Sequence, residues 1–184
     1  MNFAKNKMFF IFFMIFMLGT LSVLGVLFFN PYPLKYKKEI LDACQTHSVT
    51  PALIASMINA ESGFRKTAKS SKGAIGLMQL MPSTAKWLCD LQDKEFEEEN
   101  LFDASTNIKL GTYYMQYLLN KFQSLETAVS AYNAGEGNVM VWLLNEKYAP
   151  DHKTIVSTPY PETNAYLSKV MKGVEVYQKK FKEN

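Results

Sequence analysis

From residue 36 onward, the chain is a succession of segments in which apolar residues recur at helical spacing. Thr50-Pro51 and Pro82 followed by Ser and Thr are typical helix starts, and Asp103 is a suitable N-cap for a long helix. Only the small, polar segment 66–76 has the composition of a loop or short hairpin. The sequence therefore predicts a mainly α domain of about seven helices with at most one small β-hairpin. The expected helices are 36–46, 51–60, 82–91, 103–122, 124–132, 139–144 and 162–181.

The second of these helices carries a carboxyl group in line with its apolar residues. Ile54, Met57, Ile58 and Glu61 share one face at helical spacing, and Gly63 is a plausible C-terminal cap. Burial on that face raises the pKa of a carboxyl group and favours its protonated form, as a general acid requires. The alternative is a helix-terminal Glu61 that turns outward to solvent.

A run of 22 residues without a charge, from Met8 to Phe29, precedes this domain. Such a run is long enough to span a bilayer as a helix. A cleaved signal peptide is the alternative, but its apolar part is usually shorter and ends at small residues. We expect a cytoplasmic N-terminus over 1–7, a transmembrane anchor over 8–29, a linker over 30–35 and a catalytic domain over 36–184.

The charge and the cysteine content narrow the class of function. Residues 30–184 hold 18 of the 20 basic residues and all 17 acidic ones, so we expect no nucleic-acid partner. Cys44 and Cys89 are compatible with a disulfide or with two buried thiols. Their spacing matches no metal motif, and His47 and His152 are isolated. We expect neither a metal nor a cofactor.

Three further polar features stand out. A Ser- and Gly-rich loop follows Glu61, Gln79 lies alone in an apolar turn, and Tyr132-Asn133 lies where a break over residues 133–137 begins. Apolar side chains can cover sugar faces, while amide and hydroxyl groups bind sugar hydroxyl and N-acetyl groups. Local capping and turn formation are the structural alternative for each polar residue.

The chain contains, in this order, Glu61-Ser62, Gly76 to Pro82 (GLMQLMP), Asn107-Ile108 with Gly111 and Tyr114, Ala131 to Gly135 (AYNAG), and Pro161-Glu162-Thr163 with Tyr166. These motifs resemble those of the lytic transglycosylases of glycoside hydrolase family 23. The resemblance covers about residues 36–180 and departs at Asn164, where relatives often carry Arg.

The resemblance implies a lysozyme-like helical fold and cleavage of the β-1,4 bond between N-acetylmuramic acid and N-acetylglucosamine in peptidoglycan. Glu61 would protonate the leaving oxygen and then deprotonate the muramic C6 hydroxyl, which gives a 1,6-anhydro end. Ordinary glycosidases use two carboxyl groups, but no second acid is paired with Glu61 in a motif here. The substrate-binding residues that the resemblance implies are Ser70, Gln79, Met81, Tyr132, Asn133 and Tyr166, with Tyr132 and Tyr166 orienting or polarising Glu61.

Two other functions fit the same residues. The first is a muramidase of the same fold, which would need a carboxylate to position water. The second is a non-catalytic peptidoglycan-binding component of an envelope-spanning machine, although such a protein would be expected to lose Glu61 or Gln79. The expected partners are peptidoglycan strands and, through residues 8–29, the cytoplasmic membrane. We expect a monomer whose domain lies on the extracytoplasmic side.

Overall fold

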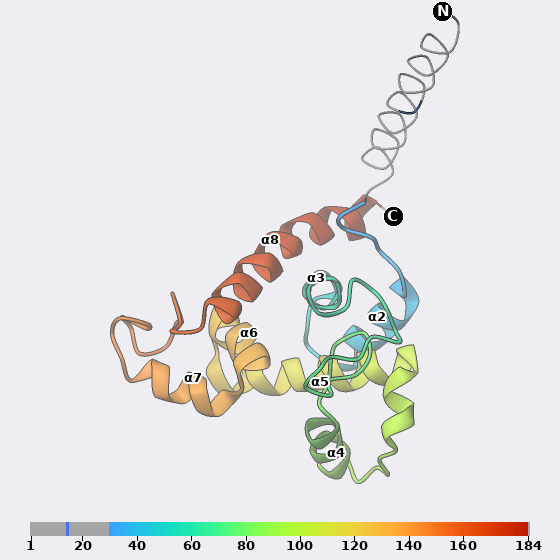
Figure 1. Ribbon diagram of the computed structural model, residues 1–184, viewed down its shortest axis with the longest axis horizontal. Helices are drawn as coiled ribbons and strands as arrows, with labels where there is room; N and C mark the ends of the chain where they lie inside the picture. Colours follow the sequence, from blue (N-terminus) through green and yellow to red (C-terminus); the bar gives the residue numbers. More distant parts are fainter. Residues whose placement is uncertain (1–13, 15–29, 184) are drawn as a thin grey trace, which may run out of the picture. The chain divides into compact units, whose positions relative to one another are not determined.

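The helices begin and end within two residues of the predicted bounds at all but one terminus. The computed structural model describes Met14 and residues 30–183 (Figure 1). The α-helices are α2 (Lys37–Thr46), α3 (Pro51–Glu61), α4 (Pro82–Asp90), α5 (Ala104–Phe122), α6 (Leu125–Ala134), α7 (Glu136–Leu143) and α8 (Pro161–Glu183), and a short 3-10 helix, η1 (Glu98–Phe102), precedes α5.

Polar side chains cap three of these helices at the N-terminus. The Thr50 hydroxyl accepts a hydrogen bond from the Leu53 amide, the Asp103 carboxylate accepts one from Thr106, and Ser124 caps α6. Each bond satisfies an amide that has no partner within its own helix. These caps explain why the sequence signals locate the helix starts closely.

Helix α3 lies at the centre of the domain and packs most extensively against α8 (Figure 1). All residues from Ala52 to Ile58 are buried, so the helix is covered on every side rather than along the predicted stripe alone. The Ser56 hydroxyl donates to the Val170 carbonyl at 2.7 Å, and Gly173 leaves no room for a Cβ atom beside Ser56. This close contact fixes α3 against α8.

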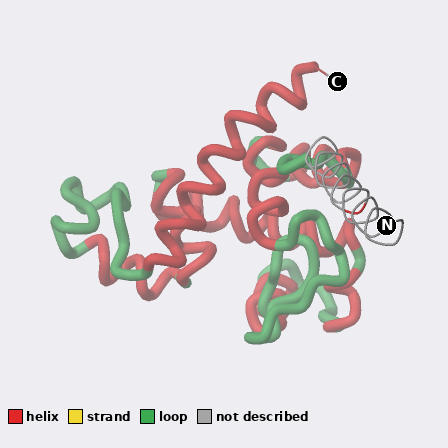
Figure 2. The backbone as a smooth tube through the Cα atoms, turned by 45° about the horizontal axis from the view of Figure 1, so that its top comes forward, coloured by secondary structure: helices red, strands yellow, loops and turns green. Residues whose placement is uncertain are grey.

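The segment between α3 and α4 is a folded loop (Figure 2), and the part of the chain that the structure describes contains no strand. Isolated bridges pair Ile75 with Lys69 and with Leu80. Buried Asn107 holds the loop, because its Nδ2 donates to the Ile75 and Leu101 carbonyls and its Oδ1 accepts from the Met78 amide. Gly111 lies against the Met78 side chain, which leaves no room for a Cβ atom at this position.

The junction between α6 and α7 differs from the prediction. We expected a break over residues 133–137 and a helix that starts at Val139. Instead α6 continues to Ala134, and α7 begins at Glu136. Gly135 alone leaves the helical conformation, with a φ of 84° that glycine adopts readily. Asn133 therefore lies in the last turn of a helix.

Two apolar cores hold the domain together. One surrounds α3 and the other lies between the 75–80 turn, α4 and α5. Tyr114 and Tyr132 pack against both, so they lie at the boundary between the cores. Cys44 borders the first core, and Cys89 belongs to the second. Both are free thiols in this structure, which favours two separate thiols over a disulfide.

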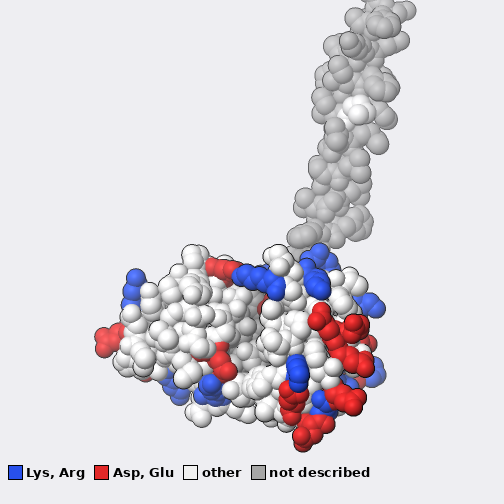
Figure 3. Space-filling view, turned by 60° about the horizontal axis from the view of Figure 1, so that its bottom comes forward, with Lys and Arg blue, Asp and Glu red and all other residues white. Residues whose placement is uncertain are grey.

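The described residues from Tyr32 onward form one compact unit. Acidic side chains gather over one part of its surface, and much of the rest of the same face is uncharged (Figure 3). Among the described residues, no helix has the length and apolarity needed to cross a bilayer. The anchor predicted over residues 8–29 lies outside the described residues, apart from Met14.

Candidate active site

Glu61 is the last residue of α3, where the helix meets the 75–80 turn. The hydroxyl of the next residue, Ser62, is buried and donates to the carbonyls of Ile58 and Leu77, at 3.2 and 2.8 Å. Gly63 follows with a φ of 58°, which supports the predicted glycine at the helix end. The helix end and the turn are thus fixed to each other beside the carboxyl group.

The environment of Glu61 favours a protonated carboxyl group. The side chain is half-buried, and burial raises its pKa from 4.5 to about 7. The Tyr166 hydroxyl and the Lys169 ammonium group oppose this rise, and the Glu162 carboxylate adds to it. The sequence therefore predicted the direction of the pKa change and its main cause correctly.

Tyr166 faces Glu61 from α8. Its hydroxyl oxygen is buried and forms no hydrogen bond of standard geometry with any described residue. Nevertheless, the same hydroxyl is the strongest influence that lowers the pKa of Glu61. The Tyr166 hydroxyl is therefore close enough to Glu61 to influence its pKa.

Tyr132 approaches Glu61 from α6 but does not bind it. Its hydroxyl donates to the Met78 carbonyl at 2.9 Å. Burial, followed by the nearby Glu61 charge, holds the pKa of Tyr132 well above its ordinary value. Tyr132 therefore supports the turn and borders the carboxyl group, and its role in orienting or polarising Glu61 stays a prediction.

Gln79 lies in the turn with a left-handed backbone, at a φ of 48°. Its Nε2 donates to the Gly76 and Ala68 carbonyls at 2.8 and 3.2 Å, so the side chain holds the loop closed. Its Oε1 takes part in neither bond and is the atom available to a ligand. Met81, at the N-cap of α4, is exposed.

Ser70 and Asn133 also make local bonds. The Ser70 hydroxyl accepts from the Ala74 amide at 2.9 Å within the loop. Asn133 Oδ1 accepts from the Thr163 hydroxyl at 2.8 Å, which joins α6 to α8. Asn133 also lines a polar pocket of about 450 Å³, whose other lining residues are Lys72, Ala134, Asn138, Tyr160, Pro161, Glu162 and Thr163.

The structure thus groups Tyr132 and Tyr166 around Glu61 and places Asn133 on a separate pocket nearby. Asn164, the departure from the family pattern, accepts from the Thr158 amide and donates to the Thr158 carbonyl, so it closes the preceding loop. The sequence interpretation did not single out Lys169, whose Nζ donates to the Ala60 carbonyl at 3.1 Å. The sequence could have indicated Lys169, because residues three apart on a helix share a face and Lys169 follows Tyr166 by three residues on α8.

Comparisons with known proteins show which family the chain resembles. The family model described as "Transglycosylase SLT domain" matches residues 39–155. The soluble lytic murein transglycosylase of Salmonella typhimurium is 32% identical over 155 residues, which cover 82% of this chain and 24% of that protein. The membrane-bound lytic murein transglycosylase C of Haemophilus influenzae is 31% identical over 171 residues, which cover 80% of this chain and 47% of that protein.

A solved structure is also similar. The 70-kDa soluble lytic transglycosylase of Escherichia coli superposes with a TM-score of 0.74 at 28% identity, over 82% of this chain and 25% of that one. The chain therefore spans about a quarter of the length of these soluble relatives. The superposition confirms the lysozyme-like, mainly α fold.

Proposed function

Because this chain belongs to the transglycosylase SLT domain family, we propose that it is a lytic transglycosylase that cleaves peptidoglycan. Its substrate is the β-1,4 bond between N-acetylmuramic acid and N-acetylglucosamine, and its product carries a 1,6-anhydromuramic end. The observation that carries this proposal is the half-buried Glu61, whose pKa is raised to about 7 by burial.

Glu61 serves as acid and then as base. In the first step the protonated carboxyl donates its proton to the glycosidic oxygen, and the bond from that oxygen to the muramic C1 breaks. In the second step the carboxylate removes the proton from the C6 hydroxyl, and the C6 oxygen bonds to C1. Glu61 ends protonated as it began, and no water is consumed.

The surrounding side chains support these two steps. The Tyr166 hydroxyl faces the carboxyl without another partner of standard geometry among the described residues, so it can donate a hydrogen bond when Glu61 becomes charged. Lys169 adds a positive charge that stabilises the same state. Gln79 Oε1, Met81, Ser70 and Asn133 would contact sugar units on either side of the bond.

We also propose that residues 8–29 anchor the enzyme in the cytoplasmic membrane. The 22-residue uncharged run in the sequence supports this, as does the similarity to a transglycosylase named as membrane-bound. The substrate lies outside that membrane, so the domain over residues 36–184 would be extracytoplasmic, with residues 1–7 in the cytoplasm and 30–35 as the linker.

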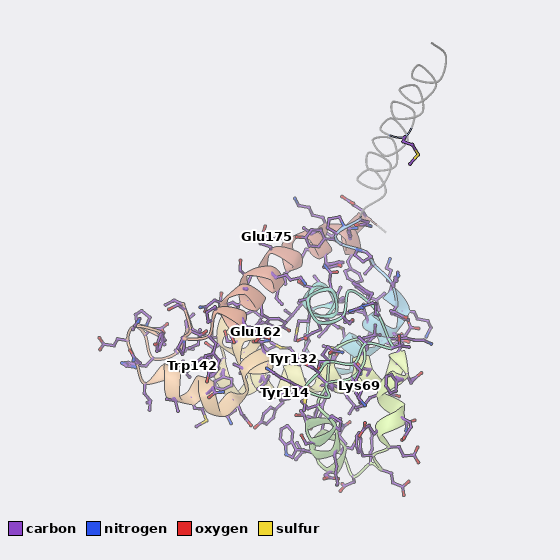
Figure 4. All side chains as sticks on the ribbon, in the orientation of Figure 1. Lys69, Tyr114, Tyr132, Trp142, Glu162 and Glu175 are labelled. Carbon is purple, nitrogen blue, oxygen red and sulfur yellow. The ribbon has the colours of Figure 1, made fainter. Side chains whose placement is uncertain are left out.

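The test compares three full-length proteins on purified peptidoglycan. The parent and Glu175→Gln should release soluble fragments at the same rate, because Glu175 is exposed on α8 and lies apart from Tyr132 in Figure 4. Glu61→Gln should be inactive. If Glu61→Gln digests the wall as fast as the parent, Glu61 is not the acid and the proposed function is wrong.

A further inference from the structure

Four aromatic side chains form a continuous row that begins beside Glu61. The ring centroids of Tyr132 and Tyr114 are 5.2 Å apart, and those of Tyr114 and Tyr117 are 6.3 Å apart. Trp87 follows, at 5.0 Å from Tyr117 and 6.2 Å from Tyr114. We call these four residues the aromatic row; they come from α4, α5 and α6, and Figure 4 labels the first two.

The row is partly accessible to solvent, since each of its four residues is half-buried rather than fully buried. Its first members, Tyr132 and Tyr114, lie where the two apolar cores meet. Tyr117 and Trp87 lie farther along, and the motifs around Glu61 do not include them. A row with only a core function would be expected to bury rings of this size, because large apolar side chains contribute most when they are fully covered.

A polar rim lies beside the far end of the row. Glu136 Oε2 accepts from the Tyr117 hydroxyl at 3.3 Å and forms an ion pair with Lys121 at 2.5 Å. The Lys121 Nζ is also 5.8 Å from the centre of the Tyr117 ring. Both charged side chains are about one-third exposed, so a ligand can reach them.

This combination matches the chemistry of a sugar. A pyranose ring has apolar faces, which pack on aromatic rings, and hydroxyl groups at its edge, which bind carboxylate and ammonium groups. Binding sites generally combine such apolar walls with a few fixed polar groups. We propose that Trp87 and Tyr117, with Glu136 and Lys121, form a distal sugar-binding subsite for the glycan strand.

The subsite rests on the proposed function, because it binds the strand whose scissile bond lies at Glu61. It gives the enzyme a preference for long strands over short ones. Trp87→Ala should raise KM for long glycan strands about tenfold, which corresponds to about 1.4 kcal/mol. The same variant should raise KM for a short substrate much less, so the ratio of the two KM values should change.

The chain offers a direct binding measurement because it contains only two tryptophans. Trp142 lies on α7 and is buried, and the centroid of its ring is 5.0 Å from that of Tyr160. Trp142→Phe therefore leaves Trp87 as the only tryptophan, and Trp87→Phe leaves Trp142. The probes are a β-1,4-linked N-acetylglucosamine hexasaccharide and the disaccharide, added to full-length protein that also carries Glu61→Gln.

The hexasaccharide should change the fluorescence of the Trp142→Phe protein, and the disaccharide should not. The Trp87→Phe protein should show no change. If Trp142→Phe does not fold, the contribution of Trp87 is the fluorescence change of the parent minus that of Trp87→Phe. The proposal is overturned if the hexasaccharide binds without altering Trp87 fluorescence, or if Trp87→Ala lowers activity equally on short and long substrates.

The two proposals fail in different ways. A parent that digests peptidoglycan while Trp87 fluorescence stays constant would exclude the subsite and leave the proposed function intact. A parent that neither digests peptidoglycan nor binds the hexasaccharide would contradict the proposed function itself.

Discussion

Replacement of Glu61 by Gln should change how the stability of the domain depends on pH. Gln has nearly the same shape as Glu but cannot ionise. In the folded protein, burial raises the pKa of Glu61 from 4.5 to about 7, and in the unfolded chain the pKa returns to its ordinary value. The folded state therefore binds this proton more tightly than the unfolded state does.

The sign of the effect follows from this difference. Below about pH 4.5 both states are protonated, and Glu61 has no net effect on folding. As the pH rises from 4.5 to about 7, the unfolded chain releases its proton first, so the parent loses stability. A pKa difference of this size is worth about 3 kcal/mol. Because the side chain is half-buried, solvent screens part of this effect, and we expect the parent to lose about 2–3 kcal/mol in free energy of unfolding.

The assay is urea unfolding of the parent, Glu61→Gln and Glu175→Gln at about pH 5 and about pH 8. Between these two pH values, the free energy of unfolding of Glu61→Gln should rise by about 2 kcal/mol relative to that of the parent. This interval covers most of the pH range over which Glu61 titrates in the unfolded and folded states. Glu175→Gln, at an exposed site, should follow the parent at both. An equal difference between Glu61→Gln and the parent at both pH values would mean that Glu61 titrates as an ordinary carboxyl group.

Three further predictions concern the supports of the site. Asn107→Ala should lower the free energy of unfolding by about 3 kcal/mol or more in urea, because three buried backbone groups lose a partner; a loss below about 1 kcal/mol would contradict this. Gly173→Ala should destabilise the parent by about 1–3 kcal/mol, because the new Cβ atom meets the Ser56 hydroxyl. The same substitution should cost much less in a protein that also carries Ser56→Ala, and equal losses in both proteins would exclude that contact. Tyr166→Phe should move the alkaline fall of kcat/KM to higher pH, because the hydroxyl lowers the pKa of Glu61; an unchanged or lower midpoint would refute this.

Local signals in the sequence were sufficient to place most of the helices. Thr50 and Asp103 cap their helices in the structure as their side-chain chemistry predicts. The raised pKa of Glu61 was also predictable, because a residue in line with Ile54 and Ile58 must share part of their burial. These inferences depend on residues close together in the chain.

The details that the sequence does not encode lie where distant segments meet. The hydroxyl of Tyr132 binds the carbonyl of Met78, 54 residues earlier, and no local pattern encodes that choice. The α6–α7 junction was predicted too wide, because Gly135 alone makes a turn that the sequence suggested would need five residues.

The central claim is that Glu61 acts as both acid and base without a water molecule, and product analysis tests it most directly. Peptidoglycan strands digested by the full-length parent should be separated and weighed by mass spectrometry. The account predicts muramic ends in the 1,6-anhydro form, which lack one water relative to hydrolysed ends, and no such products with Glu61→Gln. Reducing muramic ends with no anhydro product would contradict the account and identify a hydrolase of the same fold.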